Sequence, residues 1–312
     1  MAKVSIIGAG FVGSTTAYVL AMRKLADEVV LVDIQDRPCR GKALDIAQAT
    51  GVFGLPVRVR GGAEYASIAD SDVVVITAGV PRKPDQKRED TLLVNAKIMD
   101  SVIENVKRHA PEAVLVVVTN PLDAMTWLAA ELSGVDKRKV VGMAGTLDTA
   151  RFKLFVSERL DVSPSKVEAL VLGGHGDLMV PLSRLATVDG ARLTDKLPTE
   201  ELRAIEERTR HGGAEIVNLL GNGSAYYATA AAIFEVVEAI LRESSKPVPV
   251  SAWLDGEYEL KGLFLGVPCL LGKEGVREVV ELPLDKTELA ALHASAASVK
   301  KLVAELEKGR GA

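Results

Sequence analysis

The sequence predicts an α/β protein, with an N-terminal doubly wound parallel sheet followed by a C-terminal domain of mixed α+β structure. In the first half, short runs of valine, isoleucine and leucine alternate with helical patterns, as in parallel strands that helices cover on both faces. A glycine-rich turn joins the first such run to the first helix. Beyond residue 145, long helices and short strands replace this alternation. We therefore expect two domains, at residues 1–145 and 146–312.

The expected elements follow the apolar runs and helical repeats in chain order. In the first domain the expected strands are Val4–Ile7, Val29–Val32, Val57–Arg60, Val73–Thr77, Val114–Val118 and Val140–Gly142, and the expected helices are Ser14–Arg23, Gly41–Ala49 and Leu92–Arg108. In the second domain we expect a helix ending at Leu160, strands at Val167–Leu172, Leu185–Val188, Val248–Leu254, Leu263–Leu271 and Val276–Glu281, and helices at Thr199–Gly221, Ala225–Glu243 and Lys286–Lys308.

The glycine-rich turn has the spacing of a dinucleotide site. It reads Gly8-Ala9-Gly10-Phe11-Val12-Gly13 between the first strand and the first helix. In such a Rossmann motif, Gly8 permits the tight turn, Gly10 lets the backbone approach a pyrophosphate, and Gly13 lets the helix pack closely on the strand. The N–H groups at the start of the helix favour phosphate binding. The alternative is an α/β turn that binds nothing.

An acidic residue ends the second strand and indicates which dinucleotide is bound. Asp33 follows Gly13 by about 20 residues, the usual separation in this motif. A carboxylate here accepts hydrogen bonds from a ribose diol and repels a 2′-phosphate. Ile34 and Gln35 follow, with no arginine directly adjacent. The sequence therefore predicts NAD rather than NADP.

One histidine of the chain's four has the surroundings of a proton-transfer group. His175 lies in Gly173-Gly174-His175-Gly176-Asp177, just after an expected strand. Asp148 and Arg151 share one face if their segment is helical, which offers a carboxylate for one imidazole nitrogen and a cation for an anionic substrate. A glycine-flanked polar turn is usually only a turn, but the dinucleotide motif favours the catalytic interpretation. His109, His211 and His293 are interpreted as structural or surface residues.

Two loops follow strands at the edge of the sheet where a cofactor is expected. Seven of the ten residues from Pro81 to Asp90 are charged, so this segment is either a solvated loop or a lid that closes arginines over an anionic substrate. Asn120 follows the fifth strand. Its amide either bonds a substrate oxygen or only forms the turn before Pro121.

Composition excludes several other classes. The net charge of −4 argues against nucleic acid as the main partner, and no apolar run is long enough to span a bilayer. Cys39 and Cys269 are far apart in sequence and lack metal-ligand spacing, so we expect neither a metal site nor a disulfide framework. The first strand begins too early to leave room for a signal peptide. These features predict a cytoplasmic protein.

Over essentially its whole length the sequence resembles the lactate and malate dehydrogenase family. The motifs that carry the resemblance are GAGFVG, Asp33, AGVPRKP with a following arginine, VTNP, LDTAR, GGHGD and the GSAYY run at residues 223–227. The resemblance implies that His175 is the acid/base, with Asp148 as its partner, and that Arg151 binds the substrate's C1 carboxylate as a bidentate fork. It also implies that Arg88 polarises the reacting carbonyl and that Asn120 orients the substrate.

The resemblance further implies which residues contact NAD and which substrate is taken. The implied cofactor contacts are Gly8, Gly10, Phe11, Val12, Gly13, Asp33, Thr77, Ala78, Gly79, Asn95, Val118 and Asn120. Family members acting on lactate typically have glutamine at the position of Arg82, and those acting on malate have arginine. Arg82 therefore points to malate and oxaloacetate, and the implied activity is NAD-dependent malate dehydrogenation.

The alternatives remain open at the level of sequence. A lactate or other 2-hydroxyacid dehydrogenase shares the same fold. An NAD-dependent glycosidase would need a metal held by cysteine and histidine, and a non-catalytic dinucleotide sensor would not need the acid/base set. The resemblance suggests a homotetramer, with a dimer as the second choice, and the alanine-rich stretches Gly41–Ala49 and Ala225–Ala239 are candidates for packing between subunits.

Overall fold

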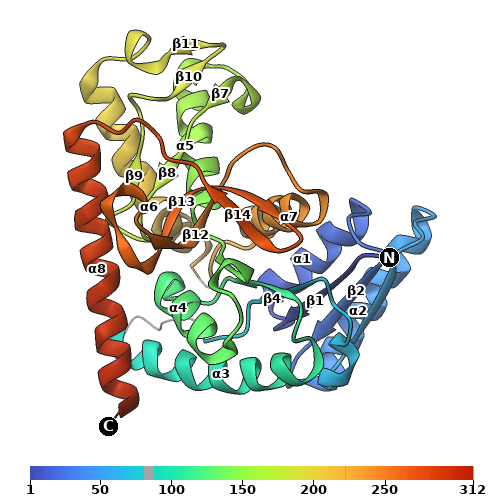
Figure 1. Cartoon of the computed structure of the whole chain (residues 1–312). Coiled ribbons are helices and arrows are strands. Elements are labelled where there is room, and N and C mark those ends of the chain that lie inside the picture. Colours follow the sequence, from blue (N-terminus) through green and yellow to red (C-terminus); the bar gives the residue numbers. More distant parts are fainter. Residues whose placement is uncertain (81–87, 222, 312) are drawn as a thin grey trace.

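The computed structural model describes residues 1–80, 88–221 and 223–311, and for residues 88–90 it describes the main chain alone. A single nine-stranded sheet runs through the molecule in the order β14-β13-β12-β6-β5-β4-β1-β2-β3. Helices cover both of its faces, and α8 stands along one side (Figure 1).

Six strands of the first half form the parallel part of the sheet. These strands are β1 (Lys3–Ile7), β2 (Glu28–Val32), β3 (Arg58–Gly62), β4 (Val73–Ile76), β5 (Val114–Val117) and β6 (Val140–Gly142). All neighbouring pairs among them are parallel. The chain winds outward from β1 in both directions, which confirms the doubly wound fold. In such a fold a ligand crevice lies outside the carboxyl ends of the neighbouring strands β1 and β4, where the winding reverses.

The sheet continues past the expected domain boundary at residue 145. The strands β12 (Val248–Asp255), β13 (Lys261–Gly272) and β14 (Gly275–Val279) extend it in antiparallel fashion. They join the parallel part where Ser251 of β12 pairs with Gly142 of β6. The C-terminal half therefore completes the large sheet and also builds structure of its own.

The helices lie where the helical patterns predict, with two exceptions. The helices are α1 (Phe11–Met22), α2 (Asp36–Val52), α3 (Arg88–His109), α4 (Leu122–Ser133), α5 (Gly145–Leu160), α6 (Thr199–Leu220), α7 (Tyr227–Arg242) and α8 (Lys286–Gly311). Short 3₁₀ turns lie at Tyr65–Ile68, Lys137–Lys139, Pro164–Lys166, Leu193–Asp195 and Glu257–Glu259. The helix α4 was not expected, and α2 begins before the expected Gly41 because Pro38 falls within its first turn, where proline is tolerated.

The predicted strand at Val167–Leu172 is wrong. The segment forms two short strands, β7 (Val167–Glu168) and β8 (Val171–Leu172), which belong to different sheets. The first lies in a sheet with β10 (Thr187–Val188) and β11 (Ala191–Arg192), and the second pairs with β9 (Val180–Pro181). An unbroken apolar run does not indicate where the chain leaves one sheet and pairs with a strand of another.

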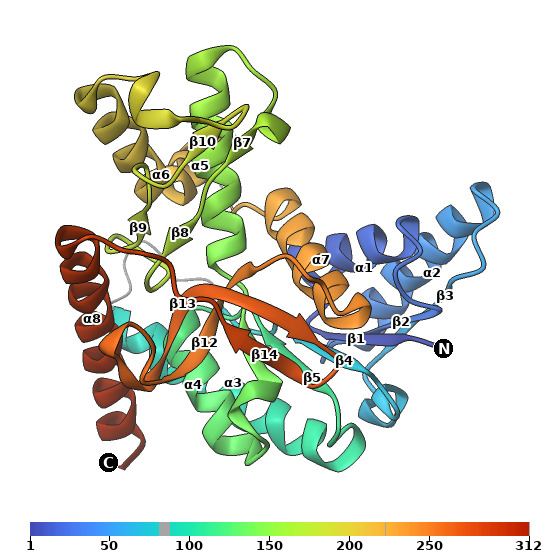
Figure 2. The same cartoon turned by 45° about the horizontal axis from the view of Figure 1, so that its top comes forward.

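Two apolar layers hold the helices against the sheet. Alternate strand residues such as Ile6 and Leu31 pack with α1, α2 and α7, and the intervening residues such as Ile7 and Val30 pack with α3 and α4. A separate core lies between α5, α6 and the small sheet of β7, β10 and β11, which form a lobe above the large sheet (Figure 2). No helix in the described part of the chain is long and apolar enough to cross a membrane.

Candidate active site

The loop between β8 and β9 places His175 against the first turn of α5. The imidazole Nδ1 lies 2.8 Å from the Oδ2 atom of Asp148. The other oxygen of this carboxylate, Oδ1, accepts a hydrogen bond of 2.8 Å from the guanidinium of Arg151. The structure therefore brings together the three residues that the sequence singled out. Because Asp148 is only 2% exposed, water competes little for these bonds.

The charges around His175 favour its protonated form. The pKa of His175 is raised, chiefly by the negative charge of Asp148, whereas burial and the charge of Arg151 act in the opposite direction. Since Nδ1 faces Asp148, the Nε2 atom is the nitrogen left for a substrate. A protonated imidazole with a free Nε2–H can donate a proton, and its neutral form can accept one.

Gly212 of α6 makes room for Arg151. A Cβ atom on Gly212 would lie 3.0 Å from Cδ of Arg151, whereas one on Gly213 would make an ordinary contact at 3.5 Å with its Nη2. Glycine inside a helix costs roughly 1 kcal/mol relative to alanine, so close packing of the arginine is the structural reason for Gly212. The Nε atom of Arg151 is buried and has no hydrogen-bond partner among the described residues, and the side chain as a whole is 12% exposed. A contact with an anion would therefore come from the terminal nitrogens of the guanidinium, of which Nη1 also bonds Asp148.

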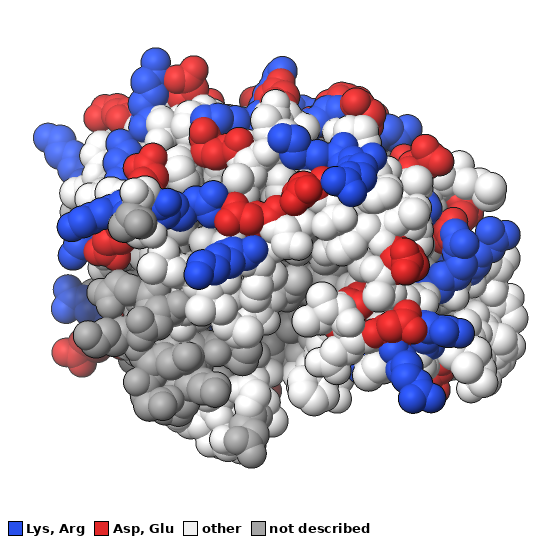
Figure 3. Space-filling model, turned by 90° about the horizontal axis from the view of Figure 1, so that it is seen from below, with Lys and Arg blue, Asp and Glu red and all other residues white. Residues whose placement is uncertain are grey.

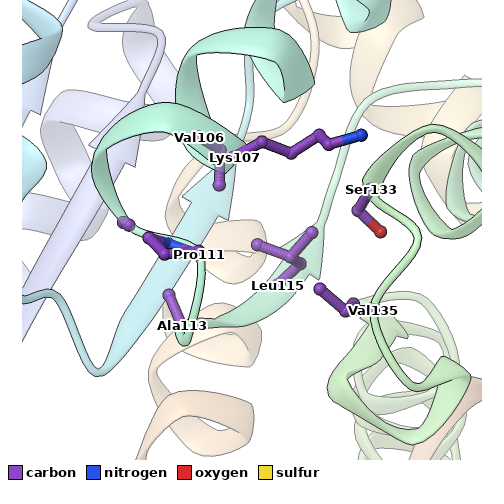
Figure 4. Close-up of a pocket in the computed structure, with 8 residues that line it drawn as sticks. Val106, Lys107, Pro111, Ala113, Leu115, Ser133 and Val135 are labelled. Carbon is purple, nitrogen blue, oxygen red and sulfur yellow. The ribbon is translucent and has the colours of Figure 1, made fainter.

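A cavity of about 450 Å³ opens beside His175. Main-chain and side-chain atoms of three regions line it, namely the start of α4, the loop around His175, and one face of α8 with Ser295, Ser298 and Val299. A smaller cavity of about 120 Å³ lies at the opposite, amino end of β5 (Figure 4). Its lining is mostly apolar and includes Leu115 and Val135. Only the larger cavity adjoins acid/base groups.

The glycine-rich turn is packed as a dinucleotide motif requires. Gly8 has φ +104°, and a Cβ atom there would lie 2.7 Å from the main-chain nitrogen of Ala78. A Cβ atom on Gly13 would overlap the carbonyl oxygen of Gly8. The hydroxyl of Thr77 donates to that same carbonyl at 2.9 Å. By contrast, a Cβ on Gly10 would meet no atom within 4 Å, so the space above the helix start is open.

Asp33 is held at the rim of this turn. Its Oδ2 accepts a hydrogen bond of 2.7 Å from the N–H of Ala9, and its Oδ1 accepts one of 2.9 Å from the N–H of Gln35. The side chain of Ile34 points away from the core and is exposed. The carboxylate keeps lone pairs for a ribose diol, so the described residues fit an NAD molecule bound in this crevice.

The loops after β4 and β5 are tied together beneath the crevice. Asn95 of α3 accepts a hydrogen bond of 2.8 Å from the N–H of Val80, and its amide donates to the carbonyl oxygen of Asn120 at 2.7 Å. The hydroxyl of Thr119 donates to the carbonyl oxygen of Ala78 at 2.7 Å. Asn95 therefore braces the main chain.

These two loops, at the carboxyl ends of β4 and β5, contain four of the expected cofactor contacts, namely Ala78, Gly79, Val118 and Asn120.

The first turn of α1 touches the second half of the chain. The ring of Phe11 stacks on Tyr226 with ring centroids 5.3 Å apart, and Val12 is partly buried. Seen from below, the upper part of this face carries interspersed Lys, Arg, Asp and Glu side chains (Figure 3).

The side chains of two expected substrate residues lie outside the described part of the chain. Arg82 lies outside the described residues, and Arg88 begins α3 with its side chain outside them. The remaining histidines lie elsewhere, since His109 ends α3, His211 bonds Glu207 and His293 bonds the carbonyl oxygen of Tyr258. Among the described residues no group of three His, Cys, Asp or Glu side chains could hold a metal ion.

Sequence reasoning missed the residues that support the catalytic groups. Asp123 and Ser295 bond the main chain of the His175 loop, and no motif marks such contacts. Gly212 had a visible signal, because a glycine inside a strong helical pattern usually has a packing reason.

Comparisons with known proteins show the family. Residues 2–142 match the family model of the lactate/malate dehydrogenase NAD binding domain, and residues 145–310 match that of the alpha/beta C-terminal domain. A protein named malate dehydrogenase from Geobacillus kaustophilus is 50% identical over 307 residues, which are 98% of each chain. The match to the NAD binding domain confirms the predicted cofactor.

Solved structures give the same result. A malate dehydrogenase structure from Salinibacter ruber is 45% identical with a TM-score of 0.95 and 99% of both chains covered. A lactate dehydrogenase structure from Cryptosporidium parvum, complexed with lactic acid and nicotinamide adenine dinucleotide, is 40% identical with a TM-score of 0.95 and 98% of both chains covered. The fold is therefore common to enzymes with both names.

Proposed function

Because the chain belongs to the lactate/malate dehydrogenase family, we propose that it is an NAD-dependent malate dehydrogenase, which interconverts malate and oxaloacetate. The observation that carries this proposal is the contact of His175 and Arg151 with one buried carboxylate, Asp148, beside an open cavity. The names of the similar proteins from Geobacillus and Salinibacter support malate as the substrate.

In the proposed mechanism His175 carries the proton. As malate is oxidised, the Nε2 atom takes the proton of the C2 hydroxyl, and Asp148 stabilises the imidazolium that forms. Bound NAD supplies the hydride acceptor for this reaction. In the reverse direction the imidazolium returns the proton to the carbonyl oxygen of oxaloacetate. The raised pKa of His175 favours the protonated form from which this step begins.

Arginines provide the anion contacts. We assign Arg151 to the C1 carboxylate, because its guanidinium bonds the same Asp148 carboxylate as His175 and so lies beside the acid/base pair. A fork of two N–H donors fixes the orientation of a carboxylate. The family resemblance assigns Arg88 to the reacting carbonyl and Arg82 to the second carboxylate of the substrate. Asn120 is assigned to orienting the substrate from the loop after β5.

The cofactor contacts follow from the crevice. We assign Gly8, Gly10 and Gly13 to the pyrophosphate turn and Asp33 to the ribose diol. Phe11, Val12, Thr77, Ala78, Gly79, Asn95, Val118 and Asn120 complete the assigned contact region. In this set Asn95 acts through the two loops that it braces.

The chain also has features of a homo-oligomer. Large apolar side chains are exposed on and just after α2, at Leu44, Val52 and Phe53, and around the end of α6 and the start of α7, at Leu219 and Tyr227. Exposed apolar surface of this kind is typical of subunit interfaces. We propose a homotetramer, with a dimer as the alternative, located in the cytoplasm and acting in the tricarboxylic acid cycle.

A steady-state comparison of oxaloacetate and pyruvate, each with NADH and with NADPH, tests the proposal. We expect the highest kcat/KM for oxaloacetate with NADH, because Asp33 disfavours a 2′-phosphate and the site is assigned a second carboxylate contact. A higher kcat/KM for pyruvate would instead identify a lactate dehydrogenase. A preference for NADPH would show that Asp33 does not select the cofactor.

A further inference from the structure

Three consecutive peptide N–H groups lead to His175, and each is bonded to a different element. The N–H of Gly173 donates to the carbonyl oxygen of Gly266 in β13 at 2.8 Å, that of Gly174 to the Ser295 hydroxyl in α8 at 2.9 Å, and that of His175 to the Asp123 carboxylate in α4 at 2.9 Å. The position of the imidazole therefore depends on contacts outside its own loop.

Asp123 is the only charged side chain among these three acceptors. It is 5% exposed, and its second oxygen accepts a hydrogen bond of 2.7 Å from the hydroxyl of Ser251 in β12. Ser251 is itself fully buried at the pairing of β12 with β6. A buried carboxylate is costly unless its oxygens are hydrogen-bonded. Here both oxygens have partners, and one of these partners is the residue that transfers the proton.

Among the described residues, the charged side chains that act on His175 come from two helices. Asp148 and Arg151 face it from α5, and Asp123 approaches it from α4. The Ser295 contact from α8 carries no charge. Burial raises the pKa of Asp123, while the bonds from Ser251 and from the His175 N–H act against that rise. As an anion, Asp123 adds to the effect of Asp148 and opposes that of Arg151.

We propose that Asp123 is a positioning residue for His175, whose carboxylate fixes the main chain of the acid/base residue and favours the imidazolium. This inference rests on the proposed function, since it concerns the same proton transfer. Asp123 touches the histidine main chain and lines the wall of the same cavity. Its effect should therefore fall on the chemical step, with little effect on the binding of NADH in the crevice at the carboxyl ends of β1 and β4.

Two variants and a control test this role. In Asp123→Ala both hydrogen bonds are lost, whereas Asp123→Asn keeps an acceptor oxygen for the His175 N–H, and the Ser251 hydroxyl can turn to accept from the amide. The control is Ser133→Ala, which removes a buried hydroxyl at the far end of α4 that bonds only its own helix, at Ala130. For each protein, kcat, KM for oxaloacetate, the Kd of NADH and the pH profile of kcat/KM are measured.

We expect Asp123→Ala to lower kcat by roughly 10- to 100-fold, the size of effect that a small misplacement of a reacting group produces. KM for oxaloacetate and the Kd of NADH should stay near the wild-type values. Asp123→Asn should recover most of kcat, but the pH at which oxaloacetate reduction declines should move downward, because a negative charge near the imidazolium is lost. Ser133→Ala should match the wild type.

Other outcomes would overturn either the positioning role of Asp123 or the proposed function. A wild-type kcat in Asp123→Ala, or an unshifted pH profile in Asp123→Asn, would overturn the positioning role. If Asp123→Ala does not fold, the profile of Asp123→Asn decides alone. Inactivity of both the wild type and Ser133→Ala toward oxaloacetate would overturn the proposed function together with this inference, whereas an active wild type with an unaffected Asp123→Ala overturns the inference alone.

Discussion

Replacing His175 by asparagine is expected to lower kcat for oxaloacetate reduction by about 10²–10⁴-fold, the usual range for a general acid/base. Asparagine can still bond Asp148, but it neither donates nor accepts a proton at neutral pH. The Kd of NADH should stay close to the wild-type value, because the glycine-rich turn and Asp33 do not contact His175. Steady-state kinetics and a fluorescence titration with NADH measure the two quantities.

A matched control comes from another histidine that bonds a carboxylate. His211 of α6 lies on the surface and bonds Glu207 at 2.9 Å, so His211→Asn should leave kcat unchanged. Near wild-type turnover in His175→Asn, under conditions where the chemical step is rate-limiting, would show that another group transfers the proton.

Replacing Arg82 by glutamine is expected to change the choice of substrate. Oxaloacetate has a second carboxylate, and truncating one partner of a buried charge pair typically costs about 2–5 kcal/mol, or roughly 30- to several-thousand-fold. Since Arg151 is assigned to the first carboxylate and Arg88 to the carbonyl, Arg82 is the arginine assigned to the second. We expect kcat/KM for oxaloacetate to fall by this order and the relative activity on pyruvate to rise.

The neighbouring cation provides the control for this variant. Lys83→Gln removes the same charge one residue away, and it should leave the ratio of the two kcat/KM values nearly unchanged. If Arg82→Gln also leaves that ratio unchanged, Arg82 does not contact the substrate. The assignment of malate would then lose its main support from the sequence.

The residues that the sequence singles out lie in recognisable local patterns of apolar runs, flanking glycines or helical spacing. The parallel strands read as apolar runs because helices bury both of their faces. His175, Asp148 and Arg151 were recognised from flanking glycines and from helical spacing. The structure joins all three through the two oxygens of Asp148.

Elements without such a signature were missed for physical reasons. The helix α4 is buried on nearly all sides, from Leu122 through Ala130, so it lacks the polar face that makes a helical repeat visible. Asp123 and Ser295 act through bonds to main-chain N–H groups. Main-chain contacts between distant segments depend on tertiary packing, which no local pattern encodes.

The pH dependence of kcat/KM, measured in both directions, tests most directly whether His175 carries the proton. Oxaloacetate reduction needs the imidazolium, so its kcat/KM should be high at low pH and fall as pH rises through the pKa of His175. Malate oxidation needs the neutral imidazole and should show the opposite trend about the same pKa. Because Asp148 raises this pKa from its ordinary value of 6.5, both profiles should turn above pH 6.5. A turning point at or below 6.5, or profiles that change in the same sense, would show that His175 paired with Asp148 does not carry the proton.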